Sequence, residues 1–402
     1  MARPRNGAGH HYAHVVGWGV AVPEQVMTNA DIERLVETND KWIRDRTGIA
    51  ERRIADERDT AATLGARAAR KALYNADILP RDVDLIVVAT SSPEYFFPST
   101  ASLIQDRIGA TRAAGFDLLA ACTGFIYALD MATAKIKCGQ IETAIVIGTE
   151  VMSRVLDWSD RSTCILFGDG AGAFVLKAND MPGGVMETVL HSDGSGSNLL
   201  TVGTGMRPVW NGQHGPQHVE MNGREVFRFA TRVMASATEE VVELAGCSMG
   251  DVDLIVPHQA NLRIIQAAAR SLRMQPEQFV VNLDRYGNTS AASIPIAVAE
   301  AAEEGRIRPN QTIVLVGFGA GLTWGATLIE WAVKPTPATA IRDVVREGQI
   351  IFGAIQSFWR RVFRYIGSAL FRPPARLYGE TFRRWTKRQN TKRKDGSQED
   401  EQ

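Results

Sequence analysis

Short runs of β-branched and other apolar residues recur along the chain without alternating polar positions. Such runs are typical of sheet strands that are buried on both faces. Between them lie longer stretches in which apolar residues return every three or four positions, as in helices that cover a sheet. This alternation predicts an α/β fold with helices packed on mixed sheets. The predicted strands are 85–89, 144–147, 254–256 and 313–316. The predicted helices are 60–74, 101–108, 225–245 and 262–272.

The pattern occurs twice. The hexapeptide DVDLIV stands at 82–87 and again at 251–256, an offset of 251 − 82 = 169 residues. The runs TAIVIG and TIVLVG end at Gly148 and Gly317, and 317 − 148 gives the same offset. Two matches at one spacing indicate a tandem duplication. We therefore expect two similar α/β halves with a site between them at the strand ends. The expected divisions are 1–180, 181–334 and an extension over 335–402.

Composition excludes several classes of function. Lys plus Arg and Asp plus Glu both number 45, so the overall charge favours no polyanion and no nucleic-acid partner is expected. The four cysteines form neither a disulfide framework nor a C-x-x-C motif. We therefore predict no metal site and expect the reducing cytoplasm. No apolar run reaches 18 residues and no secretory signal is evident, so neither a membrane span nor secretion is expected.

Cys122 lies where an apolar run gives way to small residues and then to a helical pattern. We expect a strand over 116–121 and a helix over 124–136, which places Cys122 at the start of the helix. Unpaired N–H groups and the helix dipole favour a thiolate there, so Cys122 is a candidate nucleophile. A small buried side chain without chemistry is the alternative, and position alone does not decide between them.

His258 and Asn288 are the partners that the duplication suggests. His258, in LIVPHQANLRII, follows the second copy of a repeated strand, and loops that leave strands often carry catalytic groups. Adding 169 to 122 gives 291, so GNTSAAS at 287–293 opens the helix equivalent to the one after Cys122. The two helix starts should converge on one cavity. Asn288 alone is an ordinary turn residue, but opposite Cys122 it is a hydrogen-bond donor.

Five motifs carry a resemblance to a known family. They are ACTGF (121–125), FGDGAGA (167–173), PHQAN (257–261), GNTSAAS (287–293) and GFGAGLTWG (317–325). From about His14 to Trp331 the chain resembles β-ketoacyl-acyl-carrier-protein synthase III, the initiating condensing enzyme of bacterial type II fatty acid synthesis. The resemblance implies a thiolase-like fold, with duplicated α/β halves in a five-layered αβαβα sandwich. It also implies a homodimer.

The resemblance further implies an acyltransferase with a catalytic triad of Cys122, His258 and Asn288. Cys122 would take a short acyl group from acyl-CoA, and the other two would stabilise the enolate formed when malonyl-acyl-carrier protein loses CO2. The backbone N–H groups of Cys122 and Ala320 would form the oxyanion hole. Acyl-CoA is a substrate, and no cofactor is expected. The alternative is a relative with the same triad but another donor or acceptor, such as a polyketide starter synthase or an enzyme for head-to-head acyl-CoA condensation.

Contacts for both substrates also follow from the resemblance. The nucleotide end of CoA would meet Trp42, Arg46 and Arg161. The pantetheine channel would be lined by Phe167, Met221, Gly223, Phe227 and Asn261. The acyl-carrier protein would dock on Gln259, Ala260, Asn261, Leu262, Arg263, Arg228 and Arg270. Phe97 would reach the acyl pocket of the partner subunit and would suit a short primer such as acetyl.

The chain continues for about 70 residues after Trp331, where the family normally ends. A helix is expected from about Ile341, with an apolar stripe at 351, 355, 358, 362, 366 and 370. From 348 to 394, twelve Lys and Arg stand against Glu380, a net charge of 12 − 1 = +11, and the neutral whole chain leaves −11 elsewhere. We therefore predict peripheral contact of 341–394 with the inner membrane surface. Docking on the protein's own surface or on the acidic carrier protein, and a disordered tail, are the alternatives.

Overall fold

The computed structural model describes residues 12–204, 217–331, 348, 351–353 and 355–365. The chain forms two compact units, 1–351 and 352–402. All the predicted site residues belong to the first unit.

One sheet of the first unit combines parallel and antiparallel strands in the order β1-β7-β6-β4-β5. β4 pairs in parallel with β5 and β6, whereas β7 runs antiparallel to both β6 and β1. β4 and β6 are buried at every residue, which explains the apolar runs LIVVA and AIVI within them. The strands are β1 Tyr12–Ala21, β4 Leu85–Ala89, β5 Ala114–Leu118, β6 Thr143–Val151 and β7 Asp169–Asn179.

The second sheet repeats the core of the first, in the order β11-β12-β13-β8. β11 is parallel to β12, and β13 is antiparallel to β12 and β8. The register keeps the 169-residue offset, because Leu85 pairs with Ala144 and Leu254 pairs with Ile313. At the place of a fifth strand, Phe279 forms an isolated bridge to β11. The strands are β8 Gly184–Ser192, β11 Leu254–Pro257, β12 Gln311–Gly319 and β13 Thr323–Trp331.

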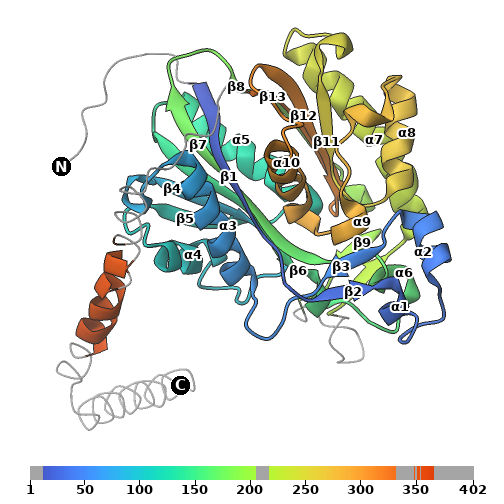
Figure 1. Ribbon diagram of the computed structural model, residues 1–402, viewed down its shortest axis with the longest axis horizontal. Coiled ribbons are helices and arrows are strands. Elements are labelled where there is room, and N and C mark those ends of the chain that lie inside the picture. Colours follow the sequence, from blue (N-terminus) through green and yellow to red (C-terminus); the bar gives the residue numbers. More distant parts are fainter. Residues whose placement is uncertain (1–11, 205–216, 332–347, 349–350, 354, 366–402) are drawn as a thin grey trace, which may run out of the picture. The chain divides into compact units, whose positions relative to one another are not determined.

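Helices cover both sheets and fill the space between them (Figure 1). α3 and α4 pack on the outer face of the first sheet, α7 and α8 lie outside the second, and α5 and α10 lie between the two. The inner helix α10 is buried along most of its length. The layers therefore follow the predicted order of helix, sheet, helix, sheet and helix. The helices are α3 Ala61–Ala76, α4 Thr100–Ile108, α5 Gly124–Lys137, α7 Gly223–Leu244, α8 Leu262–Leu272 and α10 Ser293–Glu303.

Shorter elements gather beside the second sheet, at the lower right of Figure 1. β2 pairs with β3, and β9 pairs with β10. The strands are β2 Val26–Thr28, β3 Glu51–Arg53, β9 Leu200–Val202 and β10 Val219–Met221. The helices are α1 Asn29–Ile32, α2 Asp40–Thr47, α6 Arg161–Cys164 and α9 Leu283–Tyr286.

The predicted helices and strands are present, but several bounds differ: β6 and β12 extend beyond the predicted 144–147 and 313–316, and the strand before Cys122 is displaced. It was expected over 116–121 and is β5, Ala114–Leu118. The reason is the backbone of Ala121, whose φ of 46° is left-handed and cannot continue an extended strand. β4, by contrast, has its predicted bounds of Leu85–Ala89, and α8 also begins and ends as predicted.

Matching 3₁₀ turns precede the two inner helices. Ala121–Thr123 leads into α5 and Ser290–Ala292 leads into α10, again 169 residues apart. Ala121 has a φ of 46° and Ser290 a φ of 48°, a conformation uncommon for residues other than glycine. The two turns contact each other, so the helix starts converge as the duplication predicts.

The described part of the second unit is a helix over 352–353 and 355–365. Its large apolar side chains other than Val362 are exposed, from 48% at Ile355 to 77% at Tyr365. The start predicted near Ile341 and the stripe positions 366 and 370 lie outside the described residues. Among the helices that the structure describes, none has the length and apolar character needed to cross a membrane.

Candidate active site

A cavity of about 80 Å³ lies at the strand ends where the two halves meet. Cys122 reaches it from the turn before α5, His258 from the loop after β11, and Asn288 from the turn before α10. The three chemistry-bearing residues therefore share one cavity at the predicted place. The other lining residues are Leu166, Phe167, Leu200, Met221, Gly223, Val226, Phe227, Ala260, Asn261, Ile264, Phe318 and Gly319.

Cys122 is 7% exposed, and its thiol lies 3.5 Å from the Ser290 hydroxyl. Burial raises the pKa of the Cys122 thiol to about 12, although the hydrogen bond with Ser290 acts in the opposite direction. The thiolate expected from the helix start is therefore not the resting form, because desolvation outweighs the helix dipole. The site must remove the thiol proton before Cys122 can act as a nucleophile.

His258 follows β11 and is held by its backbone N–H, which donates to the Val316 carbonyl at 2.8 Å. The side chain is 1% exposed and packs edge-on against Phe318, with ring centroids 5.3 Å apart. Neither ring nitrogen has a hydrogen-bond partner among the described residues. Burial lowers the pKa of His258 to about 3, so the imidazole is neutral at physiological pH. A neutral ring with unused nitrogens is suited to donate to a ligand.

Asn288 is 6% exposed and is held in place through its backbone. Its N–H donates to the Leu166 carbonyl at 2.8 Å, and its carbonyl accepts from Gly168 at 3.0 Å. The side-chain Oδ1 accepts from the Ser290 N–H at 2.8 Å. The Nδ2 donors are therefore the groups of this amide that remain for a ligand in the cavity.

Gly319 and Thr323 shape the backbone beside the thiol. A Cβ built on Gly319 would lie 2.9 Å from the Cys122 nitrogen, so only glycine keeps that N–H accessible. The Thr323 hydroxyl lies 2.9 Å from the Ala320 carbonyl and 3.3 Å from the Ala120 carbonyl. One hydroxyl thus ties the glycine-rich turn, which carries the second predicted oxyanion donor, to the nucleophile turn.

Known proteins match the folded part of this chain in sequence. Residues 116–194 match the family described as 3-oxoacyl-[acyl-carrier-protein (ACP)] synthase III, and 242–331 match its C-terminal part. The β-ketoacyl-[acyl-carrier-protein] synthase III of Symbiobacterium thermophilum is 51% identical over 324 residues, 79% of this chain and 97% of that protein. The chain belongs to the β-ketoacyl-acyl-carrier-protein synthase III family.

Solved structures of similar proteins have the same architecture. The synthase III of Aquifex aeolicus VF5 has a TM-score of 0.75 and 44% identity, covering 79% of this chain and 99% of that one. The priming β-ketosynthase of the R1128 polyketide pathway has a TM-score of 0.77 and 34% identity, covering 82% and 99%. The fold is thiolase-like, and the protein is an acyl-transferring condensing enzyme that initiates fatty acid synthesis. The higher identity to synthase III proteins does not favour the polyketide alternative.

The residues that synthase III proteins would use for the nucleotide end of CoA form a stacked group. Arg161 and Arg46 lie over the Trp42 ring, 5.0 and 5.4 Å from its centroid. Asn261, which lines the cavity, donates to the Arg46 carbonyl at 3.1 Å and so connects this group to the catalytic residues. The fully buried Arg52 donates to the carbonyl that follows α6, which ties β3 to the helix carrying Arg161.

The predicted carrier-protein contacts divide into two groups. The Gln259 side chain is a core group, because it is 1% exposed and bonds to two backbone carbonyls and one backbone N–H. The prediction that Gln259 contacts the carrier is therefore corrected, since the motif does not show which side of the loop a side chain takes. Arg263, Arg270 and Arg228 are exposed, and Arg228 pairs with Glu225 at 3.1 Å. The half-buried positions between them are Ala260, Asn261 and Leu262.

Phe97 lies outside the cavity of its own chain and is 86% exposed. Tyr95, Phe96 and Leu119 are also exposed, at 58%, 69% and 77%. We call these four residues the aromatic patch. Leu119 directly follows β5, which is an edge strand of its sheet. Aromatic surface beside an unpaired strand edge is typical of a protein interface.

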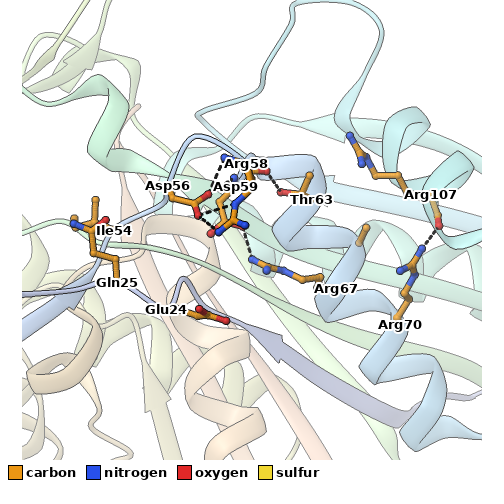
Figure 2. Close-up of a pocket in the computed structure, with 11 residues that line it drawn as sticks. Glu24, Gln25, Ile54, Asp56, Arg58, Asp59, Thr63, Arg67, Arg70 and Arg107 are labelled. Atoms are coloured by element: carbon orange, nitrogen blue, oxygen red, sulfur yellow. Dashed lines mark hydrogen bonds and ion pairs between the residues drawn. The ribbon is translucent and has the colours of Figure 1, made fainter.

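A larger groove of about 620 Å³ lies elsewhere on the first unit and holds none of the triad (Figure 2). Two of its arginines pair with neighbouring acids, Arg58 with Asp56 at 2.7 Å and Arg67 with Asp59 at 2.6 Å, and Arg70 donates to the Arg107 carbonyl. Among the described residues, no cysteine or histidine lines this groove. Convergent chemistry, and not volume, identifies the smaller cavity as the active site.

Sequence reasoning missed Glu150, Ser290 and Gly319, which surround the two 3₁₀ turns. Gly319 stands inside the quoted motif GFGAG and Ser290 inside GNTSAAS, but a motif does not show which members touch the thiol. Glu150 had a signal of its own, a carboxyl group in the otherwise apolar strand TAIVIGTEV. Charged residues at buried positions are frequent at functional sites.

Proposed function

We propose that Cys122 accepts a short acyl group, acetyl in the first place, from acyl-CoA and passes it to malonyl-acyl-carrier protein. The products are CoA, CO2 and a 3-oxoacyl-acyl-carrier protein. The observation that carries this proposal is one buried cavity that holds the Cys122 thiol, a neutral His258 and the Asn288 amide. The two thioesters supply electrophile and nucleophile, so the reaction as proposed uses no cofactor.

In the first half-reaction the deprotonated Cys122 sulfur attacks the thioester carbonyl of acyl-CoA. The tetrahedral oxyanion accepts hydrogen bonds from the N–H groups of Cys122 and Ala320. Its collapse expels CoA and leaves acyl-Cys122. Trp42 stacks on the adenine and Arg46 pairs with phosphate, so that the nucleotide positions the thioester for attack.

In the second half-reaction malonyl-acyl-carrier protein enters the same cavity and loses CO2. Negative charge develops on its thioester oxygen, which accepts hydrogen bonds from the neutral His258 ring and from Asn288 Nδ2. The low pKa of His258 keeps the ring neutral, and the N–H of a neutral imidazole is a very weak acid, so the ring donates without transferring its proton to the enolate. The enolate carbon attacks acyl-Cys122 and expels the thiolate, which takes up one proton from solvent to restore the resting thiol.

Mass spectrometry of the purified protein tests this order of events. Acetyl-CoA alone should produce an acetyl adduct on the peptide that contains Cys122. Malonyl-acyl-carrier protein should then discharge the adduct and yield the condensed carrier thioester. An adduct on Cys138, Cys164 or Cys247 would contradict the assignment of the nucleophile, and an adduct that persists would contradict the condensation.

We also propose a homodimer formed through the aromatic patch and the edge of β5. Exposed aromatic side chains gain most from burial, and the unpaired strand edge can add a second strand. Leu119→Glu would place like charges near a two-fold axis, and we expect it to give monomers in sedimentation equilibrium. Leu244→Glu, at an exposed position on α7, is the matched control. Dimers of the Leu119 variant as tight as the wild type would contradict this interface.

Finally, we propose that the protein works in the cytoplasm with its extension lying on the inner membrane surface. At 100° per residue, the apolar side chains of the extension helix fall within an arc of roughly 160°. They are Ile351, Phe352, Ile355, Phe358, Trp359, Val362, Phe363 and Tyr365. The opposite face carries Arg360, Arg361 and Arg364. Apolar burial and attraction to anionic headgroups would then act together.

Vesicle co-sedimentation tests the membrane proposal. The full chain should sediment with phosphatidylglycerol vesicles and much less with phosphatidylcholine vesicles, whereas a chain ending at Lys334 should sediment with neither. A triple variant, Phe358→Ser, Trp359→Ser and Phe363→Ser, keeps the charge and should lose most of the binding. Equal sedimentation of the full and shortened chains would eliminate the proposal.

A further inference from the structure

Glu150 is a carboxyl group without exposed surface, near the end of β6 and beside the active-site turns. Its Oε2 accepts from the Ser92 hydroxyl at 2.6 Å, from the Ser91 N–H at 3.0 Å and from the Thr90 hydroxyl at 3.3 Å. Its Oε1 lies 3.5 Å from the Ala291 N–H, in the turn that begins with Ser290, and the Ser290 side chain acts to lower the pKa of the carboxyl group. Burying a carboxyl group costs stability, so four donors around one acid indicate a function that offsets the cost.

The duplication shows what Glu150 replaces. Adding 169 to 150 gives 319, so Glu150 and Gly319 stand at the same place on equivalent strands. Gly319 leaves the Cys122 N–H accessible, whereas the Glu150 carboxyl lies against the N–H of Ala291, the counterpart of Cys122. The second copy of the oxyanion pocket is thus occupied by a protein acid in place of a substrate oxygen.

Ser290 stands between the nucleophile and this acid. Its hydroxyl lies 3.5 Å from the Cys122 sulfur, the N–H of the next residue, Ala291, lies 3.5 Å from the Glu150 carboxyl, and the Ser290 side chain acts to lower the pKa of Glu150. The ring nitrogens of His258, the other titratable group of the cavity, make no hydrogen bond to a described residue. Asp169 on the neighbouring strand β7 bonds to Ser153 and to the Ala55 N–H. Thus Glu150 is the acid that a hydroxyl connects to the thiol.

We propose that Ser290 and Glu150 form the path by which Cys122 loses its proton during acylation. This inference rests on the proposed acylation of Cys122. As the sulfur attacks acyl-CoA, its S–H bond breaks and the proton passes to the Ser290 oxygen, while the Ser290 proton passes to the Glu150 carboxylate. When the tetrahedral intermediate collapses, the departing CoA sulfur takes a proton back along the same path. The net change is acyl-CoA plus thiol to acyl-Cys122 plus CoA thiol, and Glu150 is ionised again.

Electrostatics favour this direction of transfer. The Glu150 charge helps to raise the pKa of Cys122, so a thiolate and a carboxylate do not coexist easily here. Burial raises the pKa of Glu150, which lets the carboxyl group hold a proton for the short life of the intermediate. Glu150 acts through Ser290 and does not touch the substrate, so it is a positioning residue.

Single-turnover release of CoA from acetyl-CoA, measured against pH without carrier protein, tests the path. Glu150→Gln keeps the size of the side chain and should slow the release about 100-fold at neutral pH. Its rate should then rise about tenfold per pH unit, because only solvent base removes the thiol proton. Ser290→Ala should behave alike, and the double variant should be no slower than the slower single variant, as for residues that act as a unit. Asp169→Asn, at another buried acid, should keep the wild-type rate and pH profile.

The outcomes separate this inference from the proposed function. If the wild type forms no acyl-Cys122, the proposed function fails. If the wild type is acylated and Glu150→Gln has the same rate and pH profile, the proton path is wrong. Additive losses in the double variant would also overturn it, because two merely structural defects would add. If Glu150→Gln does not fold, Ser290→Ala decides alone, since Ala121 shows that alanine accepts the same backbone conformation.

Discussion

The turns before α5 and α10 have the same backbone and different side chains. Both are 3₁₀ turns whose first residue is left-handed, with a φ of 46° at Ala121 and 48° at Ser290. One presents Cys122 to the cavity, and the other has Ala291 at the equivalent position. The strand beside the first turn ends in Gly319, and the strand beside the second carries Glu150.

This difference teaches how a duplicated fold acquires a single active site. The scaffold supplies two equivalent turns, each with an N–H group directed between the halves. A thiol and a glycine on one side leave room for a substrate oxygen. On the other side, the Glu150 carboxyl occupies the equivalent space beside the Ala291 N–H. Exchanging these side chains separates the contribution of the scaffold from that of the chemistry.

The largest effect is expected from making the two turns alike. Cys122→Ala should abolish the acyl adduct and lower the rate of condensation by roughly 10⁴-fold or more, as for loss of a nucleophile. Ala291→Cys should not become acylated, because the Glu150 carboxyl occupies the space at that N–H. Intact-protein mass spectrometry after incubation with acetyl-CoA measures both. An adduct on the Cys122 variant would show that the nucleophile is elsewhere.

The next effect concerns the strand ends. Gly319→Ala places a Cβ 2.9 Å from the Cys122 nitrogen and should lower kcat about 10²- to 10³-fold by closing the oxyanion pocket. Gly194→Ala is the control, because a Cβ built there meets no atom within 4 Å. Steady-state kinetics and thermal unfolding of both variants are the measurements. An unchanged kcat in the Gly319 variant would show that the Cys122 N–H does not stabilise the oxyanion.

The apolar periodicity and the 169-residue offset predicted the layered fold, the bounds of α8 and the meeting of Cys122 with Asn288. These features depend on alternation and spacing, which a sequence displays directly. The protonation state of Cys122 could not be predicted, because it depends on desolvation by residues from both halves. The orientation of Gln259 was missed for a similar reason, since only the tertiary structure shows which side chains of a loop turn inward.

A third prediction uses the opposite effects of burial on the pKa values of His258 and Glu150, one from each half. Burial lowers the pKa of His258 from 6.5 to about 3 and raises that of Glu150 above 4.5. Below about pH 6.5, His258 takes up a proton in the unfolded chain but not in the folded chain. His258 therefore makes the free energy of unfolding decrease as the pH falls. Glu150 acts in the other direction, because its contribution is present at low pH and is lost as the pH rises through its folded pKa.

His258→Gln should therefore lose less stability than the wild type between pH 6.5 and pH 5, by up to about 2 kcal/mol. Urea unfolding at the two pH values gives the free energies of unfolding. Glu150→Gln is the opposing control and should lose more stability than the wild type over the same interval. Equal pH slopes for His258→Gln and the wild type would mean that the folded enzyme protonates His258 normally.

The smallest expected effect is on KM, and it should differ between Trp42 in one half and Phe227 in the other. Trp42 lies under Arg46 and Arg161, whereas Phe227 lines the cavity under Arg263, whose guanidinium is 5.2 Å from the ring centroid. Only acyl-CoA carries an adenine nucleotide, but both substrates carry pantetheine. Trp42→Ala should therefore raise the KM for acetyl-CoA about fivefold, equivalent to about 1 kcal/mol of stacking, and leave kcat and the KM for malonyl-acyl-carrier protein unchanged. Phe227→Ala should raise both KM values. If Trp42→Ala raised both equally, Trp42 would support the wall of the channel and would not bind the nucleotide.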